Sequence, residues 1–319
     1  MDNFFKKKRN VVFTAIFYTF LWGCAFPLVK TCMESFQILD TDNISKCLIA
    51  GIRFSLSGVL ALLWCFFTED NRLRINRLQI KSILLYGIMA TALQYSFTYI
   101  ALSKIEGSKG AVYDQLCVFI IVLTSGIFFK SDKLNLKKII GCIIGFSGVA
   151  LINTDGFSFS FDIAGEGIML GAVICQSLAY FVAKNAADKI SAPKLVGYGQ
   201  LIGGILLCVF SVLNGGRINY ISEEGVTSLV LLILLSAVAY ILSLMPLKHF
   251  PASEVSSFNL LITVFGVIMS SVMLHENIFK WNYALSLIFI SVGIVLINSK
   301  RNSFSVQKKK GIKNDRIHI

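Results

Sequence analysis

Two charged residues stand inside long apolar stretches of the chain, Arg53 in one and Asp114 in another. A charge at such a position needs a partner or a water-filled cavity, because lipid solvates it poorly. If both stretches are membrane-spanning helices, each residue lies roughly 9 Å inside the same membrane surface, at a rise of 1.5 Å per residue. We expect the two side chains to pair or to share one polar cavity. The alternative is a structural ion pair that joins their two helices.

Asp114 is also the candidate coupling residue, the one that would link proton movement to the function of the site. A carboxylate in low-dielectric surroundings can exchange a proton near physiological pH. A second group of candidates combines aromatic faces with polar groups and would suit an amphipathic metabolite. For each of these residues, helix packing is the alternative. The group consists of Trp22, Phe26, Gln94, Tyr95, Tyr113, Gln115, Gln176 and Tyr180.

The sequence offers little for catalysis. Its three histidines, His249, His275 and His318, fall in predicted loops or in the tail, and its eight cysteines are scattered without metal-binding spacings. No phosphate-binding glycine loop occurs either, so ATP is not expected to drive this chain. We predict no cofactor and no enzymatic activity.

The composition indicates that the solvent of most of the chain is lipid. Of 319 residues, 55% are hydrophobic and 15% are charged, against about 45–50% and about 25% in soluble domains. A helix needs about 20 apolar residues to cross the hydrocarbon core. The chain offers ten such runs, and we predict an all-α integral membrane protein of ten transmembrane helices. They are placed at 10–31, 47–68, 81–103, 108–129, 137–154, 164–184, 194–213, 226–247, 253–274 and 281–299.

The positive charges predict the orientation, because cytoplasmic loops retain Lys and Arg. Of the 30 Lys and Arg residues, 23 lie in the N-terminal segment, in alternate loops and in the tail. Both termini are therefore expected in the cytoplasm, in the plasma (inner) membrane of a cell. The net charge is +12, yet no basic stripe lies on an amphipathic helix, so we expect no nucleic-acid partner.

An internal repeat organises the predicted helices. A shift of 145 residues places the sequence GVALIN at 148–153 on GIVLIN at 293–298, and helices 3 to 5 then fall on helices 8 to 10. Five helices per repeat is an odd number, so the second copy must enter the membrane from the opposite side. We predict two inverted five-helix repeats, residues 1–154 and 155–299, followed by a basic cytoplasmic tail, 300–319.

The repeat adds two candidate site residues. The 145-residue shift maps Asp114 to Asn259, and a shift of 147 maps Arg53 to Gln200. The second copy keeps polarity at these positions and loses charge. This asymmetry could serve to recognise the ionised groups of a zwitterion.

Several short motifs resemble the EamA-like family of drug/metabolite transporters. They are Leu21 to Lys30 (LWGCAFPLVK), Gly51 to Phe54 (GIRF), Tyr99 to Ala111 (YIALSKIEGSKGA), Leu247 to Ser253 (LKHFPAS) and His275 to Asn277 (HEN). The resemblance covers the whole chain. The chain departs from the family pattern in two ways: Ser131 replaces the first-repeat glutamate, and helices 4 and 9 lack their frequent proline.

The resemblance implies export or exchange of amino acids and other polar metabolites, and inverted repeats are typical of secondary transporters. We therefore expect a secondary active transporter that binds a small molecule in a cavity between the repeats. Its expected partners are that solute, the lipid bilayer and, if Asp114 couples transport, protons, with the chain acting as a monomer or a homodimer. Import of the same solutes is the alternative, and a non-transporting receptor or a membrane enzyme is a more distant one.

Overall fold

The structure is a computed structural model, and it describes residues 2–69, 73–105, 110, 113–129, 132–152, 162–274 and 281–299. All regular elements in these residues are helices, as the sequence predicts. Within these residues, seven helical segments are long and apolar enough to cross a membrane. The other three predicted spans contain helices that fall short of that length or hydropathy within the described residues, so the count of ten stays a prediction.

The helices follow the predicted runs in order. The short α1 (Asp2–Phe5) precedes the first span, and the third, sixth, eighth and ninth spans are each built from more than one element. The elements are α2 (Lys8–Ser35), α3 (Asn43–Thr68), α4 (Arg77–Gly87), the π-helix η1 (Ile88–Leu93), α5 (Gln94–Leu102), α7 (Leu116–Phe128), α8 (Leu136–Ile152), the π-helix η2 (Ile163–Gly167), α9 (Ile168–Ala186), α10 (Ala192–Leu213), α11 (Glu223–Leu244), the 3₁₀-helix η3 (Met245–Lys248), α12 (Ala252–Ser257), α13 (Leu260–Leu274) and α14 (Trp281–Asn298).

Polar residues at the helix ends fix where several spans begin. Asp42 precedes α3 and accepts a hydrogen bond from the backbone N–H of Ser45 at 3.0 Å. Ser222 precedes α11 and accepts one from Gly225 at 3.0 Å. Both side chains satisfy a backbone donor that has no partner within its own helix. Pro193 stands in the first turn of α10, where its missing N–H costs nothing.

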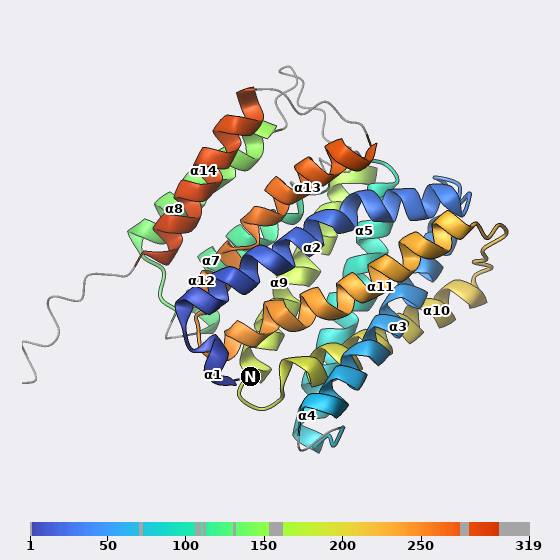
Figure 1. Cartoon of the computed structure of the whole chain (residues 1–319), viewed down its shortest axis with the longest axis horizontal. Coiled ribbons are helices and arrows are strands. Elements are labelled where there is room, and N and C mark those ends of the chain that lie inside the picture. Colours follow the sequence, from blue (N-terminus) through green and yellow to red (C-terminus); the bar gives the residue numbers. More distant parts are fainter. Residues whose placement is uncertain are drawn as a thin grey trace, which may run out of the picture.

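The two halves of the chain, residues before 153 and after 161, interlock. Helix α2 of the first half packs against α11 and α13 of the second, and α9 of the second half packs against α5 and α7 of the first. The remaining cross-half pairs are α3 with α10 and α8 with α14. Figure 1 shows the α8–α14 pair at one end of the molecule and the α3–α10 pair toward the other. Each half therefore contributes helices to every major interface.

Glycines allow two of these pairs to approach closely. A Cβ atom on Gly148 of α8 would lie 2.8 Å from the Cβ of Phe289 on α14, and one on Gly58 of α3 would lie 2.5 Å from the backbone nitrogen of Leu201 on α10. Both separations are shorter than real Cβ contacts, so a larger residue would push the helices apart. Small residues commonly make such interfaces in membranes, where packing rather than water drives helix association.

Candidate functional site

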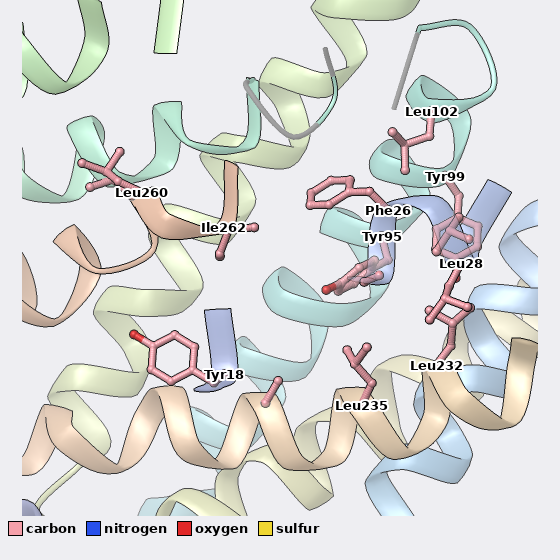
Figure 2. Close-up of a cluster of buried hydrophobic side chains, with 14 of the residues drawn as sticks. Tyr18, Phe26, Leu28, Tyr95, Tyr99, Leu102, Leu232, Leu235, Leu260 and Ile262 are labelled. Carbon is pink, nitrogen blue, oxygen red and sulfur yellow. The ribbon is translucent and has the colours of Figure 1, made fainter. Parts of the chain in front are cut away.

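A cavity of about 90 Å³ lies where helices of both halves meet, and an apolar lining with a few polar groups is typical of sites that bind small molecules. Phe26, Tyr95 and Ile262 come from three different helices and face this central space (Figure 2). Nine of the twelve residues predicted from the sequence line it. They are Trp22, Phe26, Arg53, Gln94, Tyr95, Asp114, Gln176, Tyr180 and Asn259.

Arg53 is held on one wall of the cavity and is only 1% exposed. Its Nε donates to the Oγ of Ser236 on α11 at 2.8 Å, and its Nη1 donates to the Oη of Tyr99 on α5 at 3.1 Å. The guanidinium also lies 5.7 Å from the centre of the Tyr95 ring, within the range of a cation–π contact. Its Nη2 has no hydrogen-bond partner among the described residues, and this leaves one donor for a ligand.

Asp114 lines the same cavity from the start of the fourth span. The Nε2 of Gln115 lies 3.4 Å from its Oδ2, and the side chain of Gln176 contacts the carboxylate. Within the described residues no ion pair joins Asp114 to Arg53. The two charges thus share a cavity without pairing, and the arginine is tied instead to α5 and α11.

Two spans are interrupted at corresponding points of the two halves. Asp114 precedes a turn at Gln115, after which α7 begins, and Asn259 lies in the break between α12 and α13. At both places the next turn closes through tight i to i−3 hydrogen bonds, from Val118 to Gln115 at 3.0 Å and from Ile262 to Asn259 at 2.8 Å. The breaks form without proline. Interrupted spans near the middle of a membrane protein are the usual place for a solute site.

The cavity lining repeats along the chain. Residues 145 apart that both line it are Tyr95 and Tyr240, Thr98 and Ser243, Tyr99 and Leu244, and Asp114 and Asn259; residues 154 apart are Trp22 and Gln176, Ala25 and Ala179, and Phe26 and Tyr180. The Oη of Tyr240 donates to the Oη of Tyr95 at 2.7 Å. Two residues at equivalent positions of the halves therefore touch each other at the centre of the site.

Aromatic rings and unpartnered polar atoms define what the cavity can bind. The Trp22 ring meets the Tyr240 ring edge to face, with centroids 4.6 Å apart, and forms an apolar wall with Phe26. The Oε1 of Gln176 and the Oδ1 of Asn259 are buried acceptors without a partner among the described residues. Together with Asp114 they form an acceptor-rich side of the cavity, while Arg53 supplies a donor. Such an arrangement suits a small solute that carries both a cationic and an anionic group.

Three predicted site residues lie outside the cavity lining. Gln115 and Tyr113 flank Asp114, and successive residues of a helix point in directions about 100° apart; Gln115 is buried beside Asp114, and Tyr113 packs against the apolar cluster of Ala101, Ile105, Met169 and Ala172. Gln200 faces α3 instead, and its Oε1 accepts a hydrogen bond from Ser57 at 2.7 Å. It joins two helices rather than facing a solute.

The sequence prediction missed several lining residues. Tyr99 lies four residues after Tyr95 and so shares its helix face, and Tyr240 is the 145-residue counterpart of Tyr95. Both signals were present in the sequence. Tyr86 also lines the cavity, but it stands on the other side of the π-helix η1, whose wider turns shift the register of the helix face in a way that sequence periodicity does not reveal.

Comparisons with known proteins agree with this architecture. The sequence model of the EamA-like transporter family matches residues 9–154 and again residues 163–299. An uncharacterized transporter of Bacillus subtilis (strain 168), YvbV, is 24% identical over 303 residues, which cover 92% of this chain and 93% of that protein. An uncharacterized transporter of Haemophilus influenzae is 23% identical over 92% of this chain and 99% of its own length.

A solved crystal structure has a similar fold, with a TM-score of 0.71 at 14% identity, covering 90% of this chain and 98% of the other. The long apolar helices and the central cavity define a multi-pass membrane protein of the transporter class. The chain belongs to the EamA-like transporter family, which matches it over almost its whole length.

Proposed function

We propose that this chain is a secondary active transporter that exports or exchanges small polar or amphipathic metabolites, with zwitterions such as amino acids as the main class. The proposal rests on the central cavity. Its lining is contributed by equivalent positions of the two halves, and the hydrogen bond between Tyr95 and Tyr240 lies where the halves meet. A site between two similar halves can open to either side when the halves exchange conformations.

The proposed topology is two inverted five-helix repeats with both termini in the cytoplasm of a plasma-membrane protein. The packing supports this arrangement, because α2 and α9, the first long helix of each half, make equivalent contacts with the opposite half. The concentration of Lys and Arg in alternate loops supports the orientation. Alternating access then follows as exchange between two conformations of similar energy.

The proposed solute orientation follows from the unpartnered polar atoms. An ammonium group is placed against Asp114 and the acceptor oxygens of Gln176 and Asn259, and a carboxylate against Nη2 of Arg53. Charge-assisted hydrogen bonds of this kind are about twice as strong as neutral ones. The Trp22 and Phe26 rings would pack on the apolar part of the solute. Protonation of Asp114 is the proposed route by which a proton gradient drives transport.

The test is transport by the purified full chain in liposomes. Radiolabelled amino acids of the aromatic, aliphatic, basic and acidic classes are presented singly, with an imposed pH gradient or with the same amino acid inside the vesicle. We expect uptake or exchange of at least one zwitterionic class and none of the corresponding amino-acid amides, which lack the carboxylate. Equal movement of the amides would contradict the role of Arg53, and movement of no solute under any gradient would contradict the transporter proposal.

A further inference from the structure

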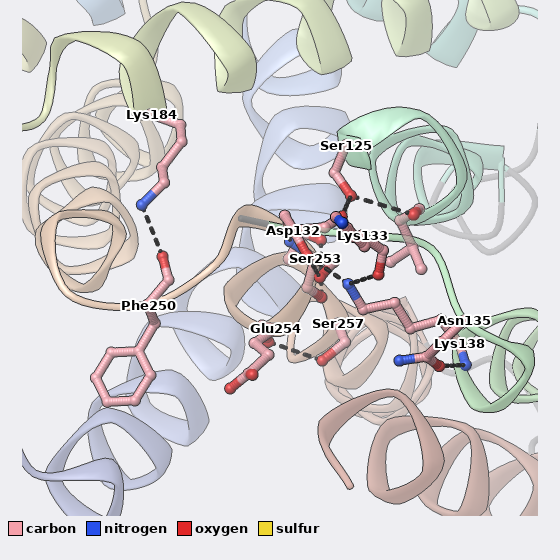
Figure 3. Close-up of polar contacts among 12 residues, drawn as sticks. Ser125, Asp132, Lys133, Asn135, Lys138, Lys184, Phe250, Ser253, Glu254 and Ser257 are labelled. Carbon is pink, nitrogen blue, oxygen red and sulfur yellow. Dashed lines mark hydrogen bonds and ion pairs between the residues drawn. The ribbon is translucent and has the colours of Figure 1, made fainter. Parts of the chain in front are cut away.

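The last turn of α9 carries Lys184, which fastens this helix to the end of the eighth predicted span. Its Nζ donates to the backbone carbonyls of Leu247 at 2.5 Å and Phe250 at 2.9 Å. Figure 3 shows the side chain reaching from α9 to Phe250. These carbonyls belong to the end of η3 and the turn before α12, where backbone acceptors lack partners within a helix. A cationic side chain is well suited to such a position.

This contact stands next to the wall between two cavities. Leu244 lines both the central cavity and a second cavity of about 580 Å³. The second cavity is also lined by Ala183, the neighbour of Lys184, and by the charged residues Asp188 and Lys248. In the proposed topology it opens toward the cytoplasm. The Lys184 contact thus holds together the elements that separate the solute site from that side.

The same end of the molecule carries a second contact, which joins the two halves. Asp132, in the loop between α7 and α8, accepts hydrogen bonds from the backbone N–H and the Oγ of Ser253 at 2.9 and 2.5 Å, and from Lys138. Figure 3 shows this cluster. Burial raises the pKa of Asp132, but the hydrogen bonds from Lys138 and Ser253 outweigh burial and lower its pKa below the ordinary value. The carboxylate therefore stays ionised at neutral pH.

The central cavity extends toward the opposite end. Val29 and Leu102 line it, whereas their equivalents in the second half, Ala183 and Leu247, do not. The equivalences follow from the family match, whose two copies begin 154 residues apart and end 145 residues apart. At these two positions the lining is asymmetric, and it reaches the end of the third span that lies away from Lys184.

Lys30 is the residue equivalent to Lys184, 154 positions earlier. The equivalents of Leu247 and Phe250, 145 positions earlier, are Leu102 and Ile105. Lys30 is partly exposed, and no hydrogen bond or ion pair of its side chain is recorded to the described residues, in contrast to Lys184. The bonded lysine and the unbonded lysine thus belong to equivalent positions at opposite ends of the two halves.

We propose that Lys184 and Lys30 act as alternating latches: Lys184 closes the cytoplasmic side in the conformation seen here, and Lys30 closes the external side by bonding the carbonyls of Leu102 and Ile105 in the other. This inference rests on the proposed alternating access. Neither lysine is among the residues proposed to bind the solute. Their proposed role is to set the relative populations of the two conformations. Breaking either latch removes bonds from one conformation only, and so shifts the population toward the other.

The experiment is hydrogen–deuterium exchange of the full chain in lipid nanodiscs without any solute. The variants are Lys184→Met, Lys30→Met and the double variant, with Lys189→Met as the matched control, because Lys189 is an exposed lysine at the same end. In Lys184→Met we expect the rate of amide hydrogen exchange in residues 245–257 to rise about tenfold, because the loss of a charged hydrogen bond implies a ratio of this size. We expect the rate in residues 99–105 to fall. The control should match the wild type.

Lys30→Met should leave the exchange rate of residues 245–257 as slow as in the wild type. In the double variant it should reverse the shift in conformational population that Lys184→Met produces. Lys184→Arg keeps a cationic donor and should restore most of the wild-type pattern, and it provides a folded variant if Lys184→Met does not assemble. Exchange that rises at both ends in Lys184→Met, or a double variant identical to Lys184→Met, would overturn the latch proposal.

Transport in liposomes separates this proposal from the function itself. Wild-type transport of an amino acid, without reciprocal exchange changes in the variants, would refute the latches and leave the transporter in place. Reciprocal exchange changes in a chain that moves no solute would refute the transporter and leave the two lysines as conformational latches.

Discussion

The two halves of the cavity have the same framework and different chemistry. Tyr95 and Tyr240 occupy equivalent positions and bond each other, and Asp114 and Asn259 both stand at a helix break. The first half nevertheless supplies both charges of the site. At the position equivalent to Arg53, the second half has Gln200, which bonds Ser57 of a neighbouring helix instead of facing the cavity.

This difference separates what helix packing requires of a residue from what ligand chemistry requires. Helices of the two halves must pack closely for the halves to interlock. A charge in the membrane interior is costly unless it is paired or wetted, so it persists only where it is bonded or used. Arg53 is bonded on one side by Ser236 and Tyr99 and keeps a donor free.

The largest effect is expected when the two charges of the first half are exchanged, in the double variant Arg53→Asp with Asp114→Arg. An aspartate at position 53 cannot donate to Ser236 or Tyr99, and the reversed charges would face a zwitterion with the wrong polarity. We expect transport to fall at least about 100-fold, in line with the loss of buried, hydrogen-bonded charges. The measurement is uptake of the responsive amino acid in liposomes, with thermal unfolding as the control for assembly. Transport with unchanged solute preference and pH dependence would mean that both charges are structural.

A smaller effect is expected when the carboxylate is moved between the halves. Asp114→Asn should lower transport about tenfold, because a charged acceptor becomes neutral, and should remove its dependence on the pH gradient. Adding Asn259→Asp places a carboxylate at the equivalent break and should recover part of both properties. The measurement is the rate of uptake against external pH. A pH dependence that survives in Asp114→Asn would exclude this residue as the coupling site.

The smallest effect is expected from a substitution of Gln200, the second-half equivalent of Arg53. Gln200→Leu removes the acceptor of the Ser57 hydroxyl, which can turn to a carbonyl of its own helix. We expect a loss of about 1 kcal/mol in the free energy of unfolding and a change in transport of less than about twofold. Thermal unfolding and liposome uptake measure the two quantities. A change in solute preference would show that Gln200 reaches the solute in the other conformation.

The sequence alone supported the helical class, the family and nine of the residues that line the cavity. Apolar runs of about 20 residues have few alternatives to membrane helices, and the 145-residue repeat pointed to Asn259 as the equivalent of Asp114. Nine of twelve candidate residues line the cavity because polar and aromatic residues in such runs have few other uses.

Only the tertiary structure decided which way each polar side chain faces. Gln115 and Tyr113 look equivalent to Asp114 in sequence, but their directions differ around the helix, and Gln200 turns toward Ser57 because α10 packs tightly on α3. Of the two arrangements expected for Arg53 and Asp114, pairing or a shared cavity, the structure has the shared cavity, and Arg53 bonds Ser236 and Tyr99. Such choices depend on distances between helices far apart in the chain, which hydropathy and periodicity do not contain.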